Sequence, residues 1–236
     1  EICLLLEQMG IYPESSHHEE GPGQNEIDFR YSDPLTAADN TLTFQAVVKT
    51  VAQRNGLYAD FSPKPLRHQP GNGFHINISV KGGNCEDPLS HMIAGILEHI
   101  PELTVFLNPT VASYERFGGP KAPEYISWSN QNRSQLIRVP AALDEYRRAE
   151  LRSPDPTTNP YLAFALLIYA GLDGIQQKLP LPAPTDLNLF TASADILALL
   201  QRLPLTLREA ATLAANSSFV SKYLPKTIVQ TYYDQR

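Results

Sequence analysis

The sequence predicts an α+β domain, with strands in the first two thirds of the chain and helices around them. Segments 26–31 and 73–80 alternate between apolar and polar residues, and this period of two predicts strands. An apolar stretch after Asn159 and Pro160 predicts a buried helix, because Asn is a favoured N-cap and Pro suits the first turn. A chain of 236 residues can bury one sizeable core.

Two helices with a polar segment between them are predicted at the start of the chain. Apolar residues at helical spacing predict a first helix over residues 2–9, which Gly10 ends. Asp33 is the predicted N-cap of a longer helix that reaches Gly56. Residues 17–26 lie between these helices, are polar and rich in glycine, and lead into the strand at 26–31.

Two central strands are predicted to carry polar side chains on one face. In the segment 146–152, a period of two places Arg148, Glu150 and Arg152 on the same face. Three charges on one face are unusual for a plain solvated strand. In the segment 73–80, the same alternation places three polar residues together: His75, Asn77 and Ser79. These two faces are therefore candidates for a functional site.

The last third of the chain is predicted to be mainly helical. The buried helix covers residues 161–170 and is followed by a proline-rich connector at 179–184. A helix is expected over 194–202, and Thr206 to Glu209 form a capping box that starts another. A last helix is expected from residue 217 to the end of the chain.

Charge and apolar patterning exclude two classes of function. The net charge of -6, with no basic stripe, argues against a nucleic-acid binder. No apolar run approaches the roughly 18 residues of a membrane span, and no signal peptide is evident.

Cys3 and Cys85 are interpreted as free thiols of a cytoplasmic protein, although a disulfide stays open. The start, within a helical pattern and without methionine, is interpreted as that of a fragment.

Two loops have residue types that suit small anionic or cationic ligands. The segment 17–26 holds carboxylates around a Gly-Pro-Gly turn, which could bind Mg²⁺ or Mn²⁺, or could be a solvated acidic loop. Glycines at 71 and 73 would let backbone N–H groups approach a phosphate or carboxylate, or could form only a turn.

Five arginines lie in a stretch that also holds Glu150. Guanidinium groups bind carboxylates and phosphates through two parallel hydrogen bonds, so a cluster of them suits a site with several anions. Surface salt bridges are the alternative for any single member. The arginines are Arg116, Arg133, Arg138, Arg148 and Arg152.

Taken together, these motifs resemble those of the glutamine synthetase family, in the family's order and over essentially the whole chain. The resemblance is greatest to the prokaryotic type I enzymes. The matching segments are 18–26, 63–65, 71–75, 108–114, 132–140, 150–156, 159–162 and 170–175.

The resemblance implies a glutamine synthetase/guanido kinase-like catalytic domain, with an antiparallel sheet and surrounding helices, over residues 1–236. It implies that the N-terminal β-grasp domain and the first catalytic strand, with two metal-ligand glutamates, lie outside this chain. The fragment alone is expected to be inactive.

The same resemblance implies a role for each candidate residue. Glu19 and Glu26 resemble the ligands of the metal beside the substrate glutamate, and His75 and Glu150 those of the metal that bridges ATP phosphates. Arg133 and Glu150 are the expected catalytic residues. The expected glutamate-binding residues are Gly71, Arg116 and Arg152. The residues expected on the ATP side are Asn77, Ser79, Arg138 and Arg148, with Arg133 also near the transferred phosphoryl group.

The implied activity is an ATP- and Mg²⁺- or Mn²⁺-dependent ligation of glutamate and ammonia through a γ-glutamyl phosphate, in nitrogen metabolism. Two metals and several arginines suit this chemistry, because negative charge builds on the transferring phosphoryl group. The full-length protein is expected to form a homo-oligomeric ring in the cytoplasm. Glu19, Glu26, His75 and Glu150 are expected to converge around one cavity.

Three positions depart from the family pattern. Lys121 precedes Ala122-Pro123 where the family has an ammonium-binding Glu, and Pro70 stands where many members have Asn. Phe190 lies where some bacterial members carry an adenylylated tyrosine, so that modification is not expected. The first two departures leave two alternatives open: a γ-glutamyl–amine ligase that uses a polyamine or monoamine, and a non-catalytic structural or regulatory protein.

Overall fold

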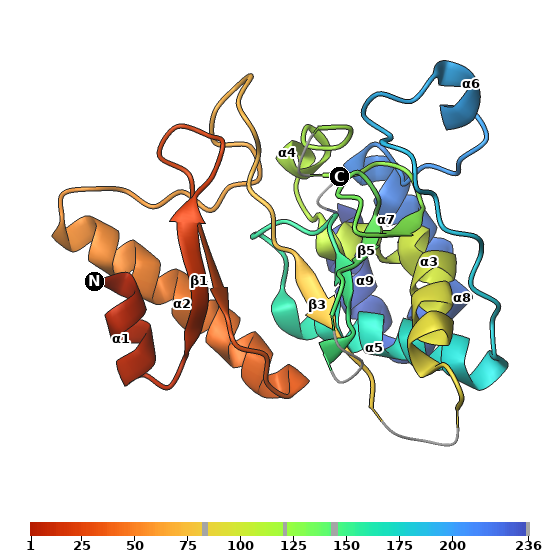
Figure 1. Ribbon diagram of the computed structural model, residues 1–236, viewed down its shortest axis with the longest axis horizontal. Coiled ribbons are helices and arrows are strands. Elements are labelled where there is room, and N and C mark those ends of the chain that lie inside the picture. The colour runs from red at the N-terminus through yellow and green to blue at the C-terminus, as the bar shows by residue number, and fades with distance from the viewer. Residues whose placement is uncertain (82–84, 120–121, 143–145, 235–236) are drawn as a thin grey trace.

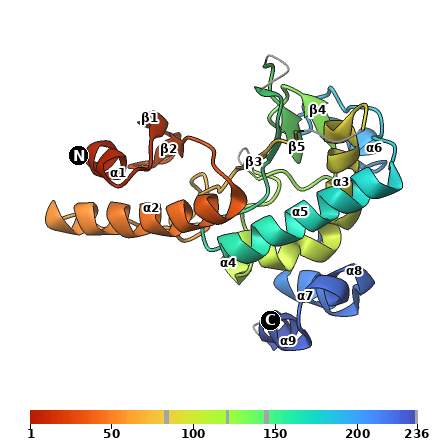
Figure 2. The same cartoon turned by 90° about the horizontal axis from the view of Figure 1, so that it is seen from below.

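The computed structural model describes residues 1–81, 85–119, 122–142 and 146–234 (Figure 1). We call residues 1–54 the N-terminal part and the remaining residues the C-terminal part. Figure 2 shows that the first helix and a two-stranded hairpin lie over one side of a long helix in the N-terminal part. In the C-terminal part, a four-stranded sheet packs on two long helices, and shorter helices lie beyond them.

The N-terminal part contains both helices predicted there. Gly10 follows the first helix with a φ of +80°, a conformation that glycine adopts without strain. Asp33 caps the second helix, since its side chain accepts a hydrogen bond from Thr36 N at 3.1 Å. The predicted strand at 26–31 pairs with an earlier strand that was not expected. The elements are α1 (Ile2–Gln8), β1 (Pro13–His18), β2 (Asn25–Phe29) and α2 (Pro34–Arg54).

The four-stranded sheet has the order β3-β6-β5-β4. β6 pairs antiparallel with both of its neighbours, whereas β4 joins β5 in parallel at one edge. The predicted strands 73–80 and 146–152 are therefore confirmed as elements, although each strand is only three residues long. The strands are β3 (Ile76–Ile78), β4 (Trp128–Asn130), β5 (Ile137–Val139) and β6 (Ala149–Leu151).

The register of this sheet separates a polar face from an apolar face. Glu150 on β6 lies opposite Asn77 on β3 and Arg138 on β5. Ile137 and Leu151 alternate with these residues and are buried in the core. Because side chains directly across a ladder share a face, one face of the sheet packs on the helices and the other presents its polar groups.

Two long helices, α3 (Pro88–Leu107) and α5 (Pro160–Gln177), form most of the core beneath the sheet. α5 was predicted, and Asn159 caps it through hydrogen bonds from the N–H groups of its first turn. α3 was not predicted, although Asp87 before Pro88 repeats the same signal and accepts a hydrogen bond from Ser90 N. Pro101 within α3 is a residue that usually interrupts a helix.

The C-terminal helices are shorter than predicted. The expected helix over 194–202 is only the single turn α6 (Ala194–Leu197), and the last predicted helix is divided at Pro225. Thr206 caps its helix as predicted, since Thr206 Oγ1 accepts from Glu209 N at 3.1 Å. The remaining helices are α4 (Val111–Tyr114), α7 (Leu207–Asn216), α8 (Ser218–Tyr223) and α9 (Lys226–Asp234).

The structure also shows the state of the two cysteines and whether any helix could span a membrane. Cys3 and Cys85 are free thiols, as predicted. Across the described ranges, every helix is too short or too polar to cross a bilayer.

α3 and α5 cross at glycines, which makes this contact sensitive to a single methyl group. A Cβ at Gly174 would lie 2.1 Å from His91 O and 2.7 Å from Gly95 Cα. These are backbone atoms, so the helices would have to separate. We expect Gly174→Ala to lower the free energy of unfolding by about 3 kcal/mol, measured by urea denaturation.

Gly171→Ala is the matched control on the same helix. Its new Cβ would lie 2.6 Å from Met92 Cγ, a side-chain atom that can move. We therefore expect a clearly smaller loss than for Gly174→Ala. Equal losses would contradict the idea that backbone contact sets the cost.

Candidate active site

The β1–β2 hairpin brings three possible metal ligands together. His17 lies opposite Glu26 in the ladder, and Glu19 follows His17 by two residues. His17 Nε2 is 3.3 Å from Glu19 Oε1 and 3.9 Å from Glu26 Oε2. One ligand atom from each of the three lies within 4.8 Å of the others. We call these three residues the hairpin cluster.

The electrostatics of the hairpin cluster favour a cation. Burial raises the pKa of Glu26 to about 7, helped by a hydrogen bond with Glu19 and by the negative charges of Asp28 and Glu19, while His17 opposes the rise. Two carboxylates and one imidazole are suitable ligands for Mg²⁺ or Mn²⁺, and the imidazole favours Mn²⁺ of the two. A bound cation would relieve the repulsion between the carboxylates. The residues present therefore fit a divalent metal.

The raised pKa of Glu26 gives a pH-dependent stability in metal-free buffer. Its folded-state pKa of about 7 exceeds the ordinary value of 4.5. The folded protein thus holds this proton more tightly, and the contribution of Glu26 to stability is lost as the pH rises from about 4.5 to 7. We expect Glu26→Gln to raise the Tm by about 2 °C at pH 8 and to leave it unchanged at pH 5, measured by calorimetry with a chelator.

Added Mn²⁺ provides the complementary check. Wild-type protein should gain Tm with Mn²⁺ at pH 8 and lose most of that gain at pH 6, because the metal needs the ionised carboxylate. Glu26→Gln should show little gain at either pH. The same Tm gain in both proteins would place the metal elsewhere.

A second group of predicted residues lies on the polar face of the sheet, around Glu150. Glu150 is only 6% exposed. Its Oε1 accepts a hydrogen bond from Arg152 Nη1 at 2.9 Å and lies 3.5 Å from His75 Nδ1, and its Oε2 accepts from Arg138 Nε. Burial alone would raise the pKa of Glu150, but the hydrogen bond from Arg138 and the positive charges of its neighbours hold that pKa below its usual value.

The other predicted residues of this face lie at its borders. Arg148 Nε donates to Asn77 Oδ1 at 3.1 Å, while Asn77 and Ser79 are exposed. The backbone oxygen of Arg133 accepts from Arg152 Nε at 3.1 Å, and the Arg133 side chain is exposed. Of the four predicted arginines, Arg138 and Arg152 thus contact the buried carboxylate itself, and Arg133 and Arg148 lie beside this group. We call this group, with His75 and Asn77, the Glu150 face.

Arg116 and Gly71 lie in direct contact with each other. A Cβ at Gly71 would lie 2.7 Å from Arg116 Cγ, so only glycine fits this contact. Arg116 is 3% exposed, and its two Nη atoms donate to Ser153 O at 3.1 Å and Pro154 O at 3.2 Å. Burial lowers the pKa of Arg116 to about 10, although the charge of Asp155 opposes this shift.

A cavity of about 310 Å³ lies beside Arg116 and Gly71 and is also lined by Lys64, His68 and Gln69. A second cavity of about 540 Å³ lies between α2 and the start of α5. Neither is lined by Glu19, Glu26, His75 or Glu150. The expectation that these four residues converge around one cavity therefore stays a prediction. Their carriers belong to two separate sheets, which do not pair within the described residues.

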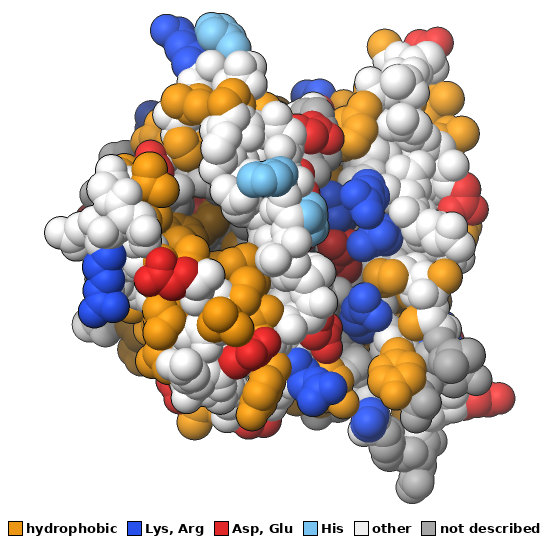
Figure 3. Space-filling view, turned by 60° about the vertical axis from the view of Figure 1, so that its left-hand side comes forward, with side chains coloured by type: hydrophobic (Ala, Val, Ile, Leu, Met, Phe, Trp, Pro, Cys, Tyr) orange, Lys and Arg blue, Asp and Glu red, His pale blue; other side chains and the backbone are white. Residues whose placement is uncertain are grey.

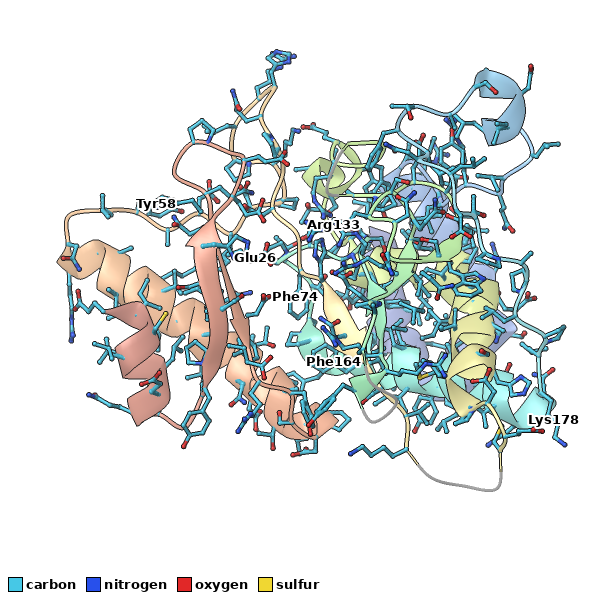
Figure 4. The ribbon with its side chains drawn as sticks, viewed as in Figure 1. Glu26, Tyr58, Phe74, Arg133, Phe164 and Lys178 are labelled. Carbon is cyan, nitrogen blue, oxygen red and sulfur yellow. The ribbon has the colours of Figure 1, made fainter. Side chains whose placement is uncertain are left out.

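The hairpin cluster belongs to the N-terminal part and the Glu150 face to the C-terminal part, on the sides of these parts that face each other. Figure 4 shows Glu26 of the N-terminal part and Arg133 of the C-terminal part on the sides that face each other. Figure 3 shows a band of basic side chains, with acidic ones among them, along the boundary between the two parts. This boundary is the candidate active site.

His17 was not among the predicted ligands, although its place two residues before Glu19 puts both on one face of an extended segment. Lys121, which stands where the family has an ammonium-binding Glu, lies outside the described residues.

Comparisons with known proteins indicate the family and the fold. A family model described as "Glutamine synthetase, catalytic domain" matches residues 1–236. A glutamine synthetase of Clostridium saccharobutylicum is 49% identical over 80% of this chain and 46% of its own length. One of Methanosarcina mazei is 45% identical over 98% of this chain and 55% of its own length. The chain thus spans about half the length of these relatives.

A solved structure of GmaS in complex with ADP superposes with a TM-score of 0.88 at 30% identity, over 99% of this chain and 57% of its own. The same protein without ligand gives a TM-score of 0.84. The predicted fold class is confirmed by this likeness and by the sheet with its surrounding helices.

Proposed function

The chain belongs to the glutamine synthetase family, and we propose that the complete protein forms glutamine from glutamate and ammonia, with ATP, through a γ-glutamyl phosphate. The observation that carries this proposal is the Glu150 face. There, one buried carboxylate is surrounded by His75, Arg138 and Arg152. A polar face of this kind suits a reaction in which phosphate oxygens and carboxylates have to be held close together.

In this proposal, the carboxylates of both groups hold divalent cations. Glu19 and Glu26, joined by His17, would hold one Mg²⁺ or Mn²⁺, and His75 and Glu150 would hold another. Such cations supply positive charge that stabilises the transferring phosphoryl group. The ion pairs of Glu150 with Arg138 and Arg152 keep its carboxylate ionised and oriented before a cation binds. A cation requires a carboxylate in this state.

The remaining predicted residues would hold the substrates. Arg138 and Arg148 would bind ATP phosphates, and Asn77 and Ser79 would lie on the nucleotide side as well. Arg133, whose side chain is exposed at the border of the Glu150 face, would contact the transferred phosphoryl group. Gly71, Arg116 and Arg152 would bind the glutamate. Gly71 and Arg116 line the smaller cavity, and Arg152 joins Glu150 to the loop of Arg133.

The whole protein's organisation is part of the same proposal. We expect a cytoplasmic homo-oligomeric ring in which residues 1–236 form most of the catalytic domain. The β-grasp domain, the first catalytic strand and the remaining metal ligands would lie in the part of the relatives' length that this chain does not span. The 236 residues alone would then be inactive. The likeness to a GmaS structure that contains ADP supports the nucleotide.

The direct test is product formation by the complete protein. Glutamate, ammonium, ATP and Mg²⁺ or Mn²⁺ should give glutamine and ADP in equal amounts, and omission of the metal should stop both. Glutamate-dependent ADP formation with methylamine or a polyamine, but not with ammonium, would favour the γ-glutamyl–amine ligase. Absence of any glutamate-dependent ATP turnover would favour the non-catalytic alternative.

The γ-glutamyl–amine ligase is a second candidate because of Lys121. A lysine near the entering ammonium would weaken its binding, since like charges repel. If this candidate is right, the complete protein uses ammonium poorly, and Lys121→Glu lowers its KM for ammonium about fivefold. The measurement is the rate of glutamine formation against ammonium concentration. A low KM that Lys121→Glu does not change would leave plain glutamine synthesis as the activity.

A further inference from the structure

Two side-chain amides join the hairpin loop to the loop of Gly71. Gln24 Nε2 donates hydrogen bonds to Asn72 Oδ1 at 2.9 Å and to Gly71 O at 3.1 Å. Gln24 Oε1 accepts from Gly21 N at 3.2 Å. Since one end of this amide faces a carbonyl oxygen and the other an N–H group, only one orientation of Gln24 satisfies all three contacts.

Asn72 continues the connection beyond Gln24. Its Nδ2 donates to Ser62 O at 2.9 Å and to Asp60 O at 3.1 Å, and its backbone N–H donates to Pro63 O at 2.9 Å. The orientation of this amide is fixed as well, because Nδ2 faces two carbonyl oxygens and Oδ1 faces the Gln24 donor. Asn72 thus holds the extended segment 60–63 and the Gly71 loop together, and Gln24 attaches both to the hairpin.

Each end of this connection lies directly at a proposed ligand site. At the hairpin end, the backbone oxygen of Gln24 accepts from Glu19 N at 2.9 Å, so Gln24 closes the loop between the two carboxylates of the hairpin cluster. At the other end, Gly71 is packed against Pro63 O and the Arg116 side chain, without room for a Cβ. The Gly71 loop is therefore held both by Gln24 of the hairpin and by its close contact with Pro63 and Arg116.

We propose that Gln24 and Asn72 are positioning residues through which a divalent cation in the hairpin cluster orders the loop that receives the amino-acid substrate. The red β1–β2 loop and the orange segment after α2, which lie side by side in Figure 1, thereby act as one unit. The identity of the substrate as glutamate rests on the proposed function. The physical coupling between the hairpin and the Gly71 loop does not rest on that function.

The test measures amide hydrogen exchange in the complete protein, with and without Mn²⁺ and without any substrate. In wild-type protein, Mn²⁺ should slow exchange of the Asn72 amide and its neighbours in segment 63–72 at least fivefold. Gln24→Met removes both donors at nearly constant size, so Mn²⁺ should slow exchange there less than twofold. Gln8→Met on the exposed side of α1 is the matched control and should behave as wild type.

Steady-state kinetics give an independent measurement. Gln24→Met should raise the KM for glutamate about tenfold, with kcat and the KM for ATP within threefold of wild type. Asn72→Asp keeps the acceptor for Gln24 and loses the donors to Asp60 and Ser62. It should also raise the KM for glutamate. Equal changes in all three constants would show a general loss of structure and overturn the proposal.

The outcomes separate this inference from the proposed function. If Mn²⁺ leaves exchange of segment 63–72 unchanged in wild-type protein, the inference is wrong, even if glutamine is formed and even if a variant fails to fold. If wild-type protein forms no γ-glutamyl product, but Mn²⁺ protects the loop and Gln24→Met abolishes that protection, the coupling is right and the proposed function is wrong.

Discussion

Replacing Glu150 by glutamine is expected to reduce the ligase rate of the complete protein at least a thousandfold and to lower its Tm. Glu150 is buried with Arg152, whose side chain is 4% exposed, and with Arg138. Removal of its charge leaves two guanidinium groups beside a neutral amide. Breaking a buried ion pair in this way costs about 3–5 kcal/mol, which corresponds to a Tm decrease on the order of 10 °C.

The decrease in rate has a separate cause, so the two measurements can be compared. Glutamine at position 150 offers a cation one neutral oxygen in place of a carboxylate, and the affinity for Mn²⁺ should fall even at temperatures where the variant is fully folded. Calorimetry gives the Tm, and glutamine formation at 15 °C gives the rate. Glu98→Gln on α3 is the control, because Glu98 is exposed and carries the same charge change. A rate within tenfold of wild type would remove Glu150 from the active site.

The Glu150 face is the part of the site that local sequence patterns predict best. The period of two placed Arg148, Glu150 and Arg152 together because alternation in a strand depends on neighbouring residues alone. The patterns did not predict that Asn77 and Arg138 lie on either side of Glu150. β3 and β6 pair although Asn77 and Glu150 are more than sixty residues apart in the sequence. No local pattern encodes the register of such a pair.

The hairpin also depends on a strand pairing that local patterns do not predict. The segment 26–31 was predicted as a strand, but its partner β1 was not, because the residues from Pro13 to His18 are polar and almost wholly exposed. Without β1 there is no register, and without register His17 cannot be placed beside Glu26. The carboxylates at 19 and 26 were singled out by their residue types and by the family resemblance. Their distance from each other became known only from the fold.

For Arg116, the residue type was informative, but its environment could not be predicted from the sequence. A guanidinium in a glycine-rich site suggests a bound carboxylate. In the structure both of its Nη atoms donate to backbone carbonyls, and its ion-pair partner Asp155 lies at 3.7 Å. Arg116 therefore supports the wall of the cavity, and this role depends on the fold of residues 153–155, far from Arg116 in the sequence.

Arg133→Ala is expected to separate phosphoryl transfer from nucleotide binding. The Arg133 side chain is exposed, and among the described residues no acidic group forms an ion pair with it. Its backbone oxygen, which accepts from Arg152 Nε at 3.1 Å, remains in the alanine variant. The Tm should therefore stay within about 2 °C of wild type. A positive group that contacts the phosphoryl oxygens as their charge grows is worth about 3–4 kcal/mol, so kcat should fall about 100- to 1000-fold.

The dissociation constant of ATP should change less than threefold, because Arg138 and Arg148 remain to bind the phosphates. Single-turnover formation of ADP gives the rate of transfer, and calorimetric titration gives the binding constant. Arg208→Ala on α7 removes an exposed arginine far from this face in the sequence and should alter neither value. If Arg133→Ala weakened ATP binding as much as it slowed transfer, Arg133 would act in the ground state as well, and its role would be binding or structure rather than catalysis. If neither changed, the exposed side chain would lie outside the site, and the border of the Glu150 face would end at Arg152.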